Sequence, residues 1–149
     1  MRDDIYVVDT NAIISYFSKI FEGDVSISKE AIELIDLAFH TSEIKLIIPS
    51  TVFIEIFIKW FKSDEISAKI KSEVYFKIKN RENMQIRVFD KETIENYIKI
   101  KDIEPDYNFD SHDKQVFASA MTMDCALITS DLHLIRYNER KNILSKIIS

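Results

Sequence analysis

The sequence predicts a three-layer α/β fold in which a central parallel sheet of four to five strands carries helices on both faces. Short apolar runs that are typical of buried strands alternate along the chain with longer stretches whose apolar residues recur at helical spacing. Strands that alternate with helices pair in parallel through right-handed crossovers, so helices are expected on both faces of one sheet. The chain has 149 residues, of which 46% are hydrophobic, and this size predicts a single globular domain over residues 1–149.

The N-terminal sequence predicts one strand followed by two helices. Residues 5–9 form a short apolar run that fits a buried strand, and residues 11–21 carry apolar residues at helical spacing. Ser28 is suited to cap a second helix over residues 29–40, whose apolar residues form a wide stripe.

The middle of the chain continues with a strand and two helices. Residues 45–48 predict the second strand, which ends at Pro49, and Ser50 can cap a helix over residues 51–62. Residues 64–79 predict a further helix, because isoleucine or valine stands at every fourth position and the exposed face is rich in lysine.

The third strand is expected over residues 85–89, and a helix follows over residues 91–101. After a polar loop, Asp110 or Ser111 can cap the next helix, over residues 112–123. Strands and helices thus continue to alternate along this part of the chain.

The C-terminal part contains the fourth strand, over residues 126–129. From Leu132 onward the pattern is less regular, and residues 142–148 fit a fifth strand or an amphipathic helix. The sheet is therefore expected to have four or five strands.

Four acidic residues stand where strands end or helices begin. Asp9 and Asp131 directly follow the first and fourth strands, while Glu55 and Asp113 lie in or at the start of helices. The active sites of open parallel sheets lie beyond the carboxyl ends of the strands. All four side chains are therefore expected to meet at this edge of the sheet.

Carboxylates that converge in a folded protein repel one another unless a cation lies between them. A hard divalent ion with oxygen ligands offsets this repulsion most readily, so the four acids predict a metal site. Each acid also has a simpler explanation. Asp9 and Asp131 could be helix caps and nothing more, and Asp113 could simply stabilise a helix N-terminus through the helix dipole. Glu55 could be an exposed helix residue. The occurrence of all four in similar settings favours the metal site.

Several residue types limit the class of protein. The single glycine, Gly23, excludes a glycine-rich phosphate loop or dinucleotide-binding motif. The single cysteine, Cys125, cannot form an internal disulfide, and its place beside an apolar run predicts a buried, inert side chain. The N-terminus lacks the features of a secretory signal and no apolar stretch is long enough to span a bilayer, so a cytoplasmic location is expected.

Charge is unevenly distributed around a net value of −5. Residues 59–101 contain eleven Lys or Arg against seven Asp or Glu, whereas residues 102–131 contain seven acids and one base. This asymmetry suits a nuclease with an acidic metal pocket flanked by cations that bind phosphate, and it suits ordinary solvated helix faces equally well. Trp60 and its aromatic neighbours could stack on bases, but their helical spacing favours packing.

The three histidines have no metal-binding spacing among themselves. All three are expected at the surface or at the edge of the core. His112 directly precedes Asp113 and is the only one of the three for which support of a metal ligand is considered.

Four segments of the sequence resemble the PIN-domain family, which includes the VapC-type toxins of toxin–antitoxin pairs and other metal-dependent RNases. An acid after an apolar run is common, but four such segments in the family's order, each in its expected strand or helix context, are much more specific. The segments extend over nearly the whole chain: Val7-Val8-Asp9-Thr10-Asn11, Ile48 through Glu55, Asp113 through Ala120, and Thr129-Ser130-Asp131.

The resemblance implies an endoribonuclease that hydrolyses RNA phosphodiester bonds with Mg²⁺ or Mn²⁺ as cofactor and leaves a 5′-phosphate and a 3′-hydroxyl. It implies that Asp9, Asp113 and Asp131 are direct or water-mediated metal ligands. Glu55 is implied to be a further ligand or the residue that orients the attacking water. It also implies that the chain is the toxin of a toxin–antitoxin pair, bound by an antitoxin protein, and that it forms a homodimer, for which the apolar helices over residues 51–78 offer a surface.

Three further residues belong to the predicted site. Asn11 and Thr129 are expected in supporting roles, because their side chains can hydrogen-bond carboxylates or backbone and hold the ligands in place. Asp110 lies one helical turn before Asp113 and could share or replace its role.

Several alternatives accompany this prediction. The same carboxylates could serve RNA processing, or the fold could act as a non-catalytic RNA-binding or protein-binding module. A haloacid-dehalogenase-like phosphatase would need a second acid where Asn11 stands and a glycine after it. A receiver domain would need its acidic pair after the first strand, whereas Asp3 and Asp4 precede that strand.

Overall fold

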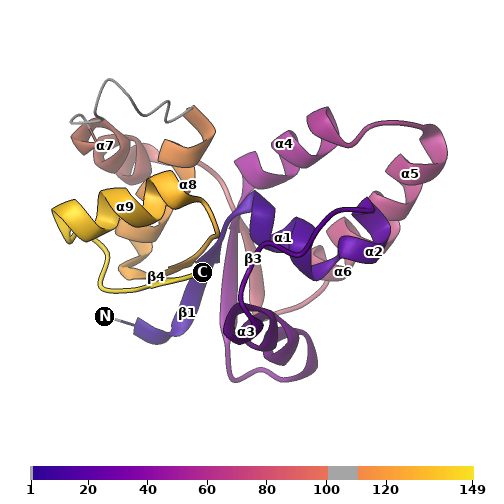
Figure 1. Cartoon of the computed structure of the whole chain (residues 1–149), viewed down its shortest axis with the longest axis horizontal. Helices are drawn as coiled ribbons and strands as arrows, with labels where there is room; N and C mark the ends of the chain where they lie inside the picture. The colour runs from indigo at the N-terminus through magenta and orange to yellow at the C-terminus, as the bar shows by residue number, and fades with distance from the viewer. Residues whose placement is uncertain (1, 101–110) are drawn as a thin grey trace.

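The computed structural model of the chain describes residues 2–100 and 111–149 (Figure 1). A five-stranded sheet with the strand order β3-β2-β1-β4-β5 lies at its centre, and every strand pairs in parallel with its neighbours. The strands are β1 (Arg2–Val8), β2 (Lys45–Pro49), β3 (Met84–Arg87), β4 (Cys125–Ile128) and β5 (Ile147–Ile148). The predicted α/β fold with a parallel sheet is confirmed.

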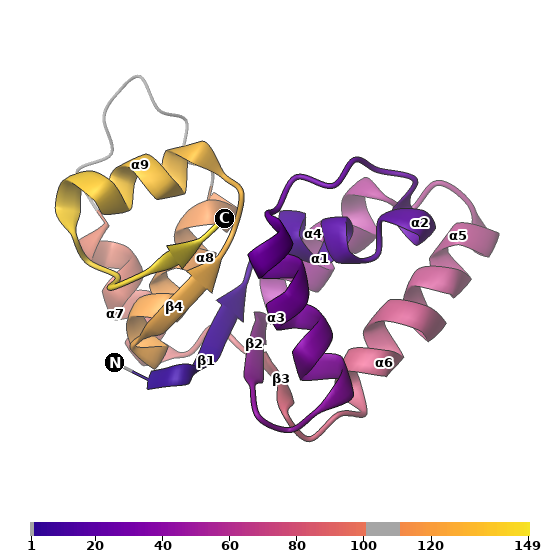
Figure 2. The ribbon, with the colours of Figure 1, turned by 60° about the horizontal axis from the view of Figure 1, so that its bottom comes forward.

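The helices are α1 (Thr10–Tyr16), α2 (Ser18–Phe21), α3 (Lys29–His40), α4 (Ser50–Lys59), α5 (Asp64–Lys69), the π-helical η1 (Ile70–Tyr75), α6 (Phe76–Lys79), α7 (Lys91–Lys99), α8 (Ser111–Met123) and α9 (Leu132–Lys141). In both views α7, α8 and α9 lie together on one side of the molecule, and α1 to α6 lie on the other (Figure 1, Figure 2). This division follows from right-handed crossovers, because the chain runs from β1 outward to β3 and then returns to β4 and β5 on the other side of β1.

The three central strands are buried on both faces, as their unbroken apolar runs require. Val7 on β1 is the register partner of both Ile47 on β2 and Leu127 on β4, and all three residues are fully buried. Cys125, at the start of β4, is buried as predicted. No helix among residues 2–100 and 111–149 is long and apolar enough to cross a membrane.

Several helix boundaries differ from the predicted ones for local reasons. The helix expected over residues 11–21 is divided at Phe17, whose ring is buried edge-on against the rings of Tyr16 and Phe39. The helix expected over residues 64–79 is continuous but contains the π-helical turns of η1. Ser50 is the first residue of α4 and not its cap, since the cap position is taken by Pro49.

The C-terminal part contains both a helix and a strand. Residues 132–141 form α9, which Asp131 caps, and the short β5 then pairs with β4 at the edge of the sheet. The tail therefore contributes the fifth strand, one of the two outcomes that the sequence allowed.

The strand order places the carboxyl ends of β1 and β4 beside each other. Val8 and Ile128 are register partners at these ends, and the backbone N–H of Asp9 donates to the carbonyl of Ile128 at 3.0 Å. The chain leaves β1 and β4 in opposite directions across the sheet, which is where open parallel sheets bind ligands. Asp9 and Thr129 stand at this point.

Candidate metal centre

Asp9 is the most buried acid of the site, with 2% of its surface exposed. One carboxylate oxygen, Oδ1, accepts a hydrogen bond from the backbone N–H of Thr10 at 2.7 Å, so Asp9 caps α1. The other, Oδ2, accepts from the hydroxyl of Thr129 at 2.7 Å and from the amide of Asn11 at 3.3 Å. These donors fix the orientation of a carboxylate that is almost fully removed from water.

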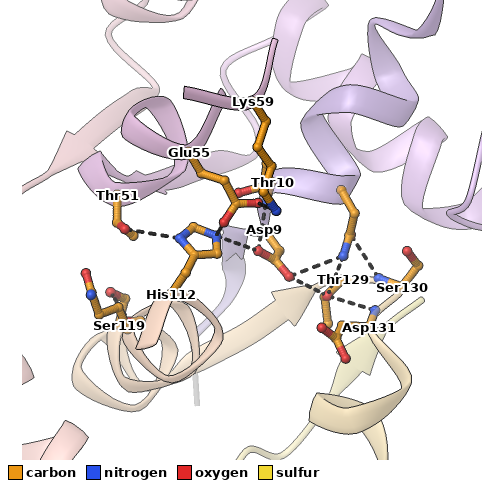
Figure 3. Close-up of polar contacts among 12 residues, drawn as sticks. Asp9, Thr10, Thr51, Glu55, Lys59, His112, Ser119, Thr129, Ser130 and Asp131 are labelled. Carbon is orange, nitrogen blue, oxygen red and sulfur yellow. Dashed lines mark hydrogen bonds and ion pairs between the residues drawn. The ribbon is translucent and has the colours of Figure 1, made fainter. Parts of the chain in front are cut away.

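Asn11 and Thr129 tie the ends of β1 and β4 together. The amide nitrogen of Asn11 also lies 3.3 Å from the hydroxyl of Thr129, and its carbonyl oxygen accepts from the backbone N–H of Ser130 at 3.1 Å. The hydroxyl of Thr129 accepts from the backbone N–H of Asp131 at 3.1 Å. Figure 3 shows this network between Asp9 and Asp131. Both supporting residues predicted from the sequence therefore contact Asp9.

Glu55 extends from α4 toward Asp9 and is half-buried. Its Oε2 lies 2.9 Å from Nε2 of His112, and its Oε1 lies 3.4 Å from the ammonium group of Lys59. Burial by itself raises the pKa of the Glu55 carboxyl, but the contacts with His112 and Lys59 more than offset this and hold the pKa below its ordinary value. Glu55 is therefore an ionised side chain between two cations.

His112 lies at the centre of the group, with 13% of its side chain exposed. Its Nδ1 lies 3.1 Å from the hydroxyl of Thr51, while Nε2 lies 2.8 Å from the hydroxyl of Thr10 (Figure 3). Nε2 is also 3.6 Å from Oδ1 of Asp9, which is an ion-pair distance too long for a hydrogen bond. Burial lowers the pKa of the imidazole, but the carboxylates of Asp9 and Glu55 outweigh it and raise the pKa to about 10.

The remaining two acids complete the border of the site. Asp113 lies in the first turn of α8, and one ligand atom from each of Asp9, His112 and Asp113 falls within 4.8 Å of the others. Asp131 caps α9, since its Oδ1 accepts from the backbone N–H groups of His133 at 2.8 Å and Leu134 at 3.4 Å. Asp110, the proposed alternative to Asp113, lies outside the described residues.

All four predicted acids line one cleft of about 270 Å³. The side chains that line it are those of Asp9, Thr10, Asn11, Ile14, Glu55, Lys59, Trp60, Asp113 and Asp131. A larger cavity of about 630 Å³ lies elsewhere, between α1, α2 and η1. Within the described part of the chain, the only cluster of three or more His, Cys, Asp or Glu side chains close enough to share an ion is Asp9, His112 and Asp113. The cleft, although smaller, is the candidate site.

The donor set of the cleft suits a divalent cation. Asp9 and Asp113 offer carboxylate oxygens, which Mg²⁺ and Mn²⁺ prefer, and Glu55 and Asp131 border the same space. His112 and Lys59 place positive charge beside Glu55, and a divalent ion would add positive charge between the carboxylates of Asp9 and Asp113.

His112 is the residue that sequence reasoning underestimated. The sequence favoured the surface or the edge of the core for this histidine and at most a supporting role beside Asp113, whereas in the structure its ring touches Glu55 directly and belongs to the same cluster as Asp9 and Asp113. The only sequence signal was its place at the start of α8, which cannot show where an imidazole points.

A family model described as PIN domain matches residues 6–140. No functionally curated protein matches the chain in sequence. Among solved structures, a chain in the crystal structure of VapBC2 from Rickettsia felis, bound to a DNA fragment from the promoter, is similar with a TM-score of 0.67 and 16% identity, over 97% of this chain and 99% of that one. A chain in the crystal structure of FitAcB from Neisseria gonorrhoeae is similar with a TM-score of 0.67 and 12% identity, over 97% of this chain and 96% of that one.

Proposed function

Since this chain belongs to the PIN domain family, we propose that it is a metal-dependent endoribonuclease that hydrolyses RNA phosphodiester bonds. The observation that carries the proposal is that Asp9, Glu55, Asp113 and Asp131 line a single cleft at the carboxyl edge of the parallel sheet. Family membership removes the basis for the phosphatase and receiver-domain alternatives. We take residues 1–149 to form one nuclease domain.

Asp9 and Asp113 would hold the ion, with Asp131 as a direct or water-mediated ligand. When bound, Mg²⁺ or Mn²⁺ would polarise the scissile phosphate and lower the pKa of the attacking water. Asn11 and Thr129 hold Asp9 at a fixed orientation through their hydrogen bonds to its Oδ2.

Glu55 would accept a proton from the attacking water or orient that water. Its carboxylate is ionised and lines the cleft next to Asp9. Lys59 lines the same cleft, where its ammonium group is suited to a phosphate of the RNA backbone. Trp60, which is half-buried and packs edge-on against Phe21, borders the cleft and offers a ring on which a base could stack.

The toxin role, with an antitoxin as partner, is a further part of the proposal. Two of the solved structures that are similar to this chain are those of VapBC2 and FitAcB, and each likeness extends over 97% of this chain. On α4, Ile54, Ile58 and Phe61 just beyond its end form an exposed apolar stripe that suits a homodimer contact or an antitoxin contact. A cytoplasmic location, where RNA and antitoxin would be met, belongs to the same proposal. A small gene directly upstream that encodes a DNA-binding, antitoxin-like protein would support it.

The nuclease proposal is tested by cleavage of a panel of structured RNAs with Mg²⁺, with Mn²⁺ and with EDTA. Wild type should cleave only with metal, and Asp9→Asn and Asp113→Asn should each lower the rate at least about 100-fold because a ligand carboxylate is lost. His40→Asn, an exposed change on α3 outside the cleft, is the matched control and should cleave normally. Circular dichroism should confirm that each variant is folded.

Two outcomes would contradict the proposal. Cleavage that survives both aspartate substitutions would refute the assignment of the acids. A biological effect that persists unchanged in Asp9→Asn would identify a non-catalytic binding module instead of a nuclease.

A further inference from the structure

The imidazole of His112 faces oxygen atoms on both sides of its ring. Nε2 lies 2.8 Å from the hydroxyl of Thr10, 2.9 Å from Oε2 of Glu55 and 3.6 Å from Oδ1 of Asp9. Nδ1, on the opposite side, lies 3.1 Å from the hydroxyl of Thr51. Figure 3 shows the ring between Thr51 on one side and Glu55 and Asp9 on the other.

The contact with Thr51 prepares Nε2 to act as a ligand. A hydrogen on Nδ1 can be donated to the Thr51 hydroxyl, which leaves the lone pair of Nε2 directed at the carboxylates. Three acceptors would then face one another: Nε2, Oε2 of Glu55 and Oδ1 of Asp9. In the metal-free protein a proton on Nε2 lies between this nitrogen and Oε2 of Glu55, and a metal ion that displaces the proton would take up the same position between the acceptors.

The distances also suit neighbouring ligands of one ion. Adjacent ligands of an octahedral ion with bonds of about 2.1 Å lie about 3 Å apart. Nε2 of His112 is 2.9 Å from Glu55 and 3.6 Å from Asp9, and the group formed with Asp113 lies within 4.8 Å. Small movements of these side chains would place all of them around a single ion.

We propose that Nε2 of His112 is a direct ligand of the ion held by Asp9 and Asp113, and that this nitrogen donor makes the site favour Mn²⁺ over Mg²⁺. This inference rests on the proposed function only in taking Asp9 and Asp113 as ligands. Mg²⁺ strongly prefers oxygen and binds through carboxylates and water, whereas imidazole is a good ligand for transition metals. A site made of carboxylates alone lacks this source of discrimination.

Pulsed electron paramagnetic resonance on the Mn²⁺-loaded protein detects the nitrogen ligand directly. The wild-type spectrum should contain the ¹⁴N modulation of a coordinated imidazole, and incorporation of ¹⁵N-histidine should change it. His112→Asn should abolish the modulation, whereas His40→Asn should leave it intact. Because the chain has three histidines, the double variant His40→Asn with His133→Asn keeps His112 as the sole imidazole, and it should retain the modulation.

Calorimetric titration tests the preference for Mn²⁺. Loss of a residue that merely supports a ligand typically weakens metal binding about 10- to 100-fold, so loss of a direct ligand should lower Mn²⁺ affinity at least about tenfold. His112→Asn should lower the ratio of Mn²⁺ to Mg²⁺ affinity by at least about tenfold as well. His112→Asp, which returns an oxygen donor, should restore Mg²⁺ binding but not the preference.

The results separate this inference from the proposed nuclease activity. One combination of results would overturn the role of His112 and leave the nuclease proposal intact. In it, Mn²⁺ binds to wild type but not to Asp9→Asn, and the wild-type spectrum shows no imidazole modulation. A ratio of Mn²⁺ to Mg²⁺ affinity that is unchanged in His112→Asn would also overturn the role of His112. Imidazole modulation in a protein that cuts no RNA would support the ligand and refute the nuclease.

Discussion

The hydroxyl of Thr129 accepts a hydrogen bond from the backbone N–H of Asp131 and donates one to the buried charge of Asp9. Its side chain is fully buried, and its hydroxyl donates to Oδ2 of Asp9 at 2.7 Å. Thr129→Val keeps the shape but leaves the carboxylate short of a donor. A hydrogen bond to a charged group contributes about 1.5–3 kcal/mol, so the free energy of unfolding in EDTA should fall by about that amount.

Urea unfolding with a matched control measures this effect. In Thr41→Val the lost hydrogen bond runs to the backbone carbonyl of Leu37, which is neutral, so the cost should be only about 1 kcal/mol. Equal losses in the two variants would show that the charge of Asp9 does not matter in the folded protein.

His112 makes the stability of the metal-free protein depend on pH. Its pKa is raised from 6.5 to about 10 by Asp9 and Glu55, which outweigh burial, so the folded state binds the proton more tightly than the unfolded state does. The stabilisation is therefore complete below the unfolded pKa and is lost as the pH rises through the folded pKa, in the window from 6.5 to about 10.

The comparison of wild type with His112→Asn in EDTA checks this dependence. The difference in their free energies of unfolding should be largest near pH 6 and should shrink steadily as the pH approaches 10. A difference that stays constant or grows over this window would show that the imidazole is neutral in the folded protein.

At the scale of elements, Asp131 combines two roles that one pair of substitutions separates. It caps α9 through hydrogen bonds to the backbone of His133 and Leu134, and it lines the cleft. Asn caps helices as well as Asp does, so Asp131→Asn should keep the stability but lower the rate of RNA cleavage. Asp131→Ala should lower both the stability and the rate of RNA cleavage, and the free energy of unfolding should fall by about 1 kcal/mol.

Thermal unfolding and cleavage assays on the same preparations decide between these roles. If Asp131→Asn cleaves RNA as fast as wild type, Asp131 acts only as a helix cap and not in cleavage. A helix capped by Asp131 was one of the interpretations that the sequence left open, and α9 begins right after this residue.

At the scale of the whole molecule, metal binding should stabilise the fold. An ion that binds only the folded chain adds about 2.7 kcal/mol when its concentration is 100 times its Kd. The midpoint of thermal unfolding should therefore rise with added Mn²⁺ or Mg²⁺ and fall back with EDTA. Asp9→Asn, which lacks a central ligand, should show little or no rise, and an equal rise in this variant would place the ion elsewhere.

The sheet and most helices could be predicted from the sequence because their signals are local. Residues 29–40 form α3 with Ser28 as its cap, as expected from a side chain that hydrogen-bonds the first turn. The helix of residues 64–79 was also expected, but its π-helical section was not, since Val74 and Ile78 keep a helical spacing that does not reveal the local hydrogen-bond pattern.

The position of Asp9 and Asp131 at one edge of the sheet follows from the sequence alone, because parallel strands point their carboxyl ends in the same direction. Glu55 and Asp113 were expected near that edge for the same reason, and all four line the cleft. That His112 lies among these acids is visible only in the folded chain. The direction of an imidazole at the start of α8 depends on how that helix packs against α4 and β1, and such long-range packing leaves no local pattern in the sequence.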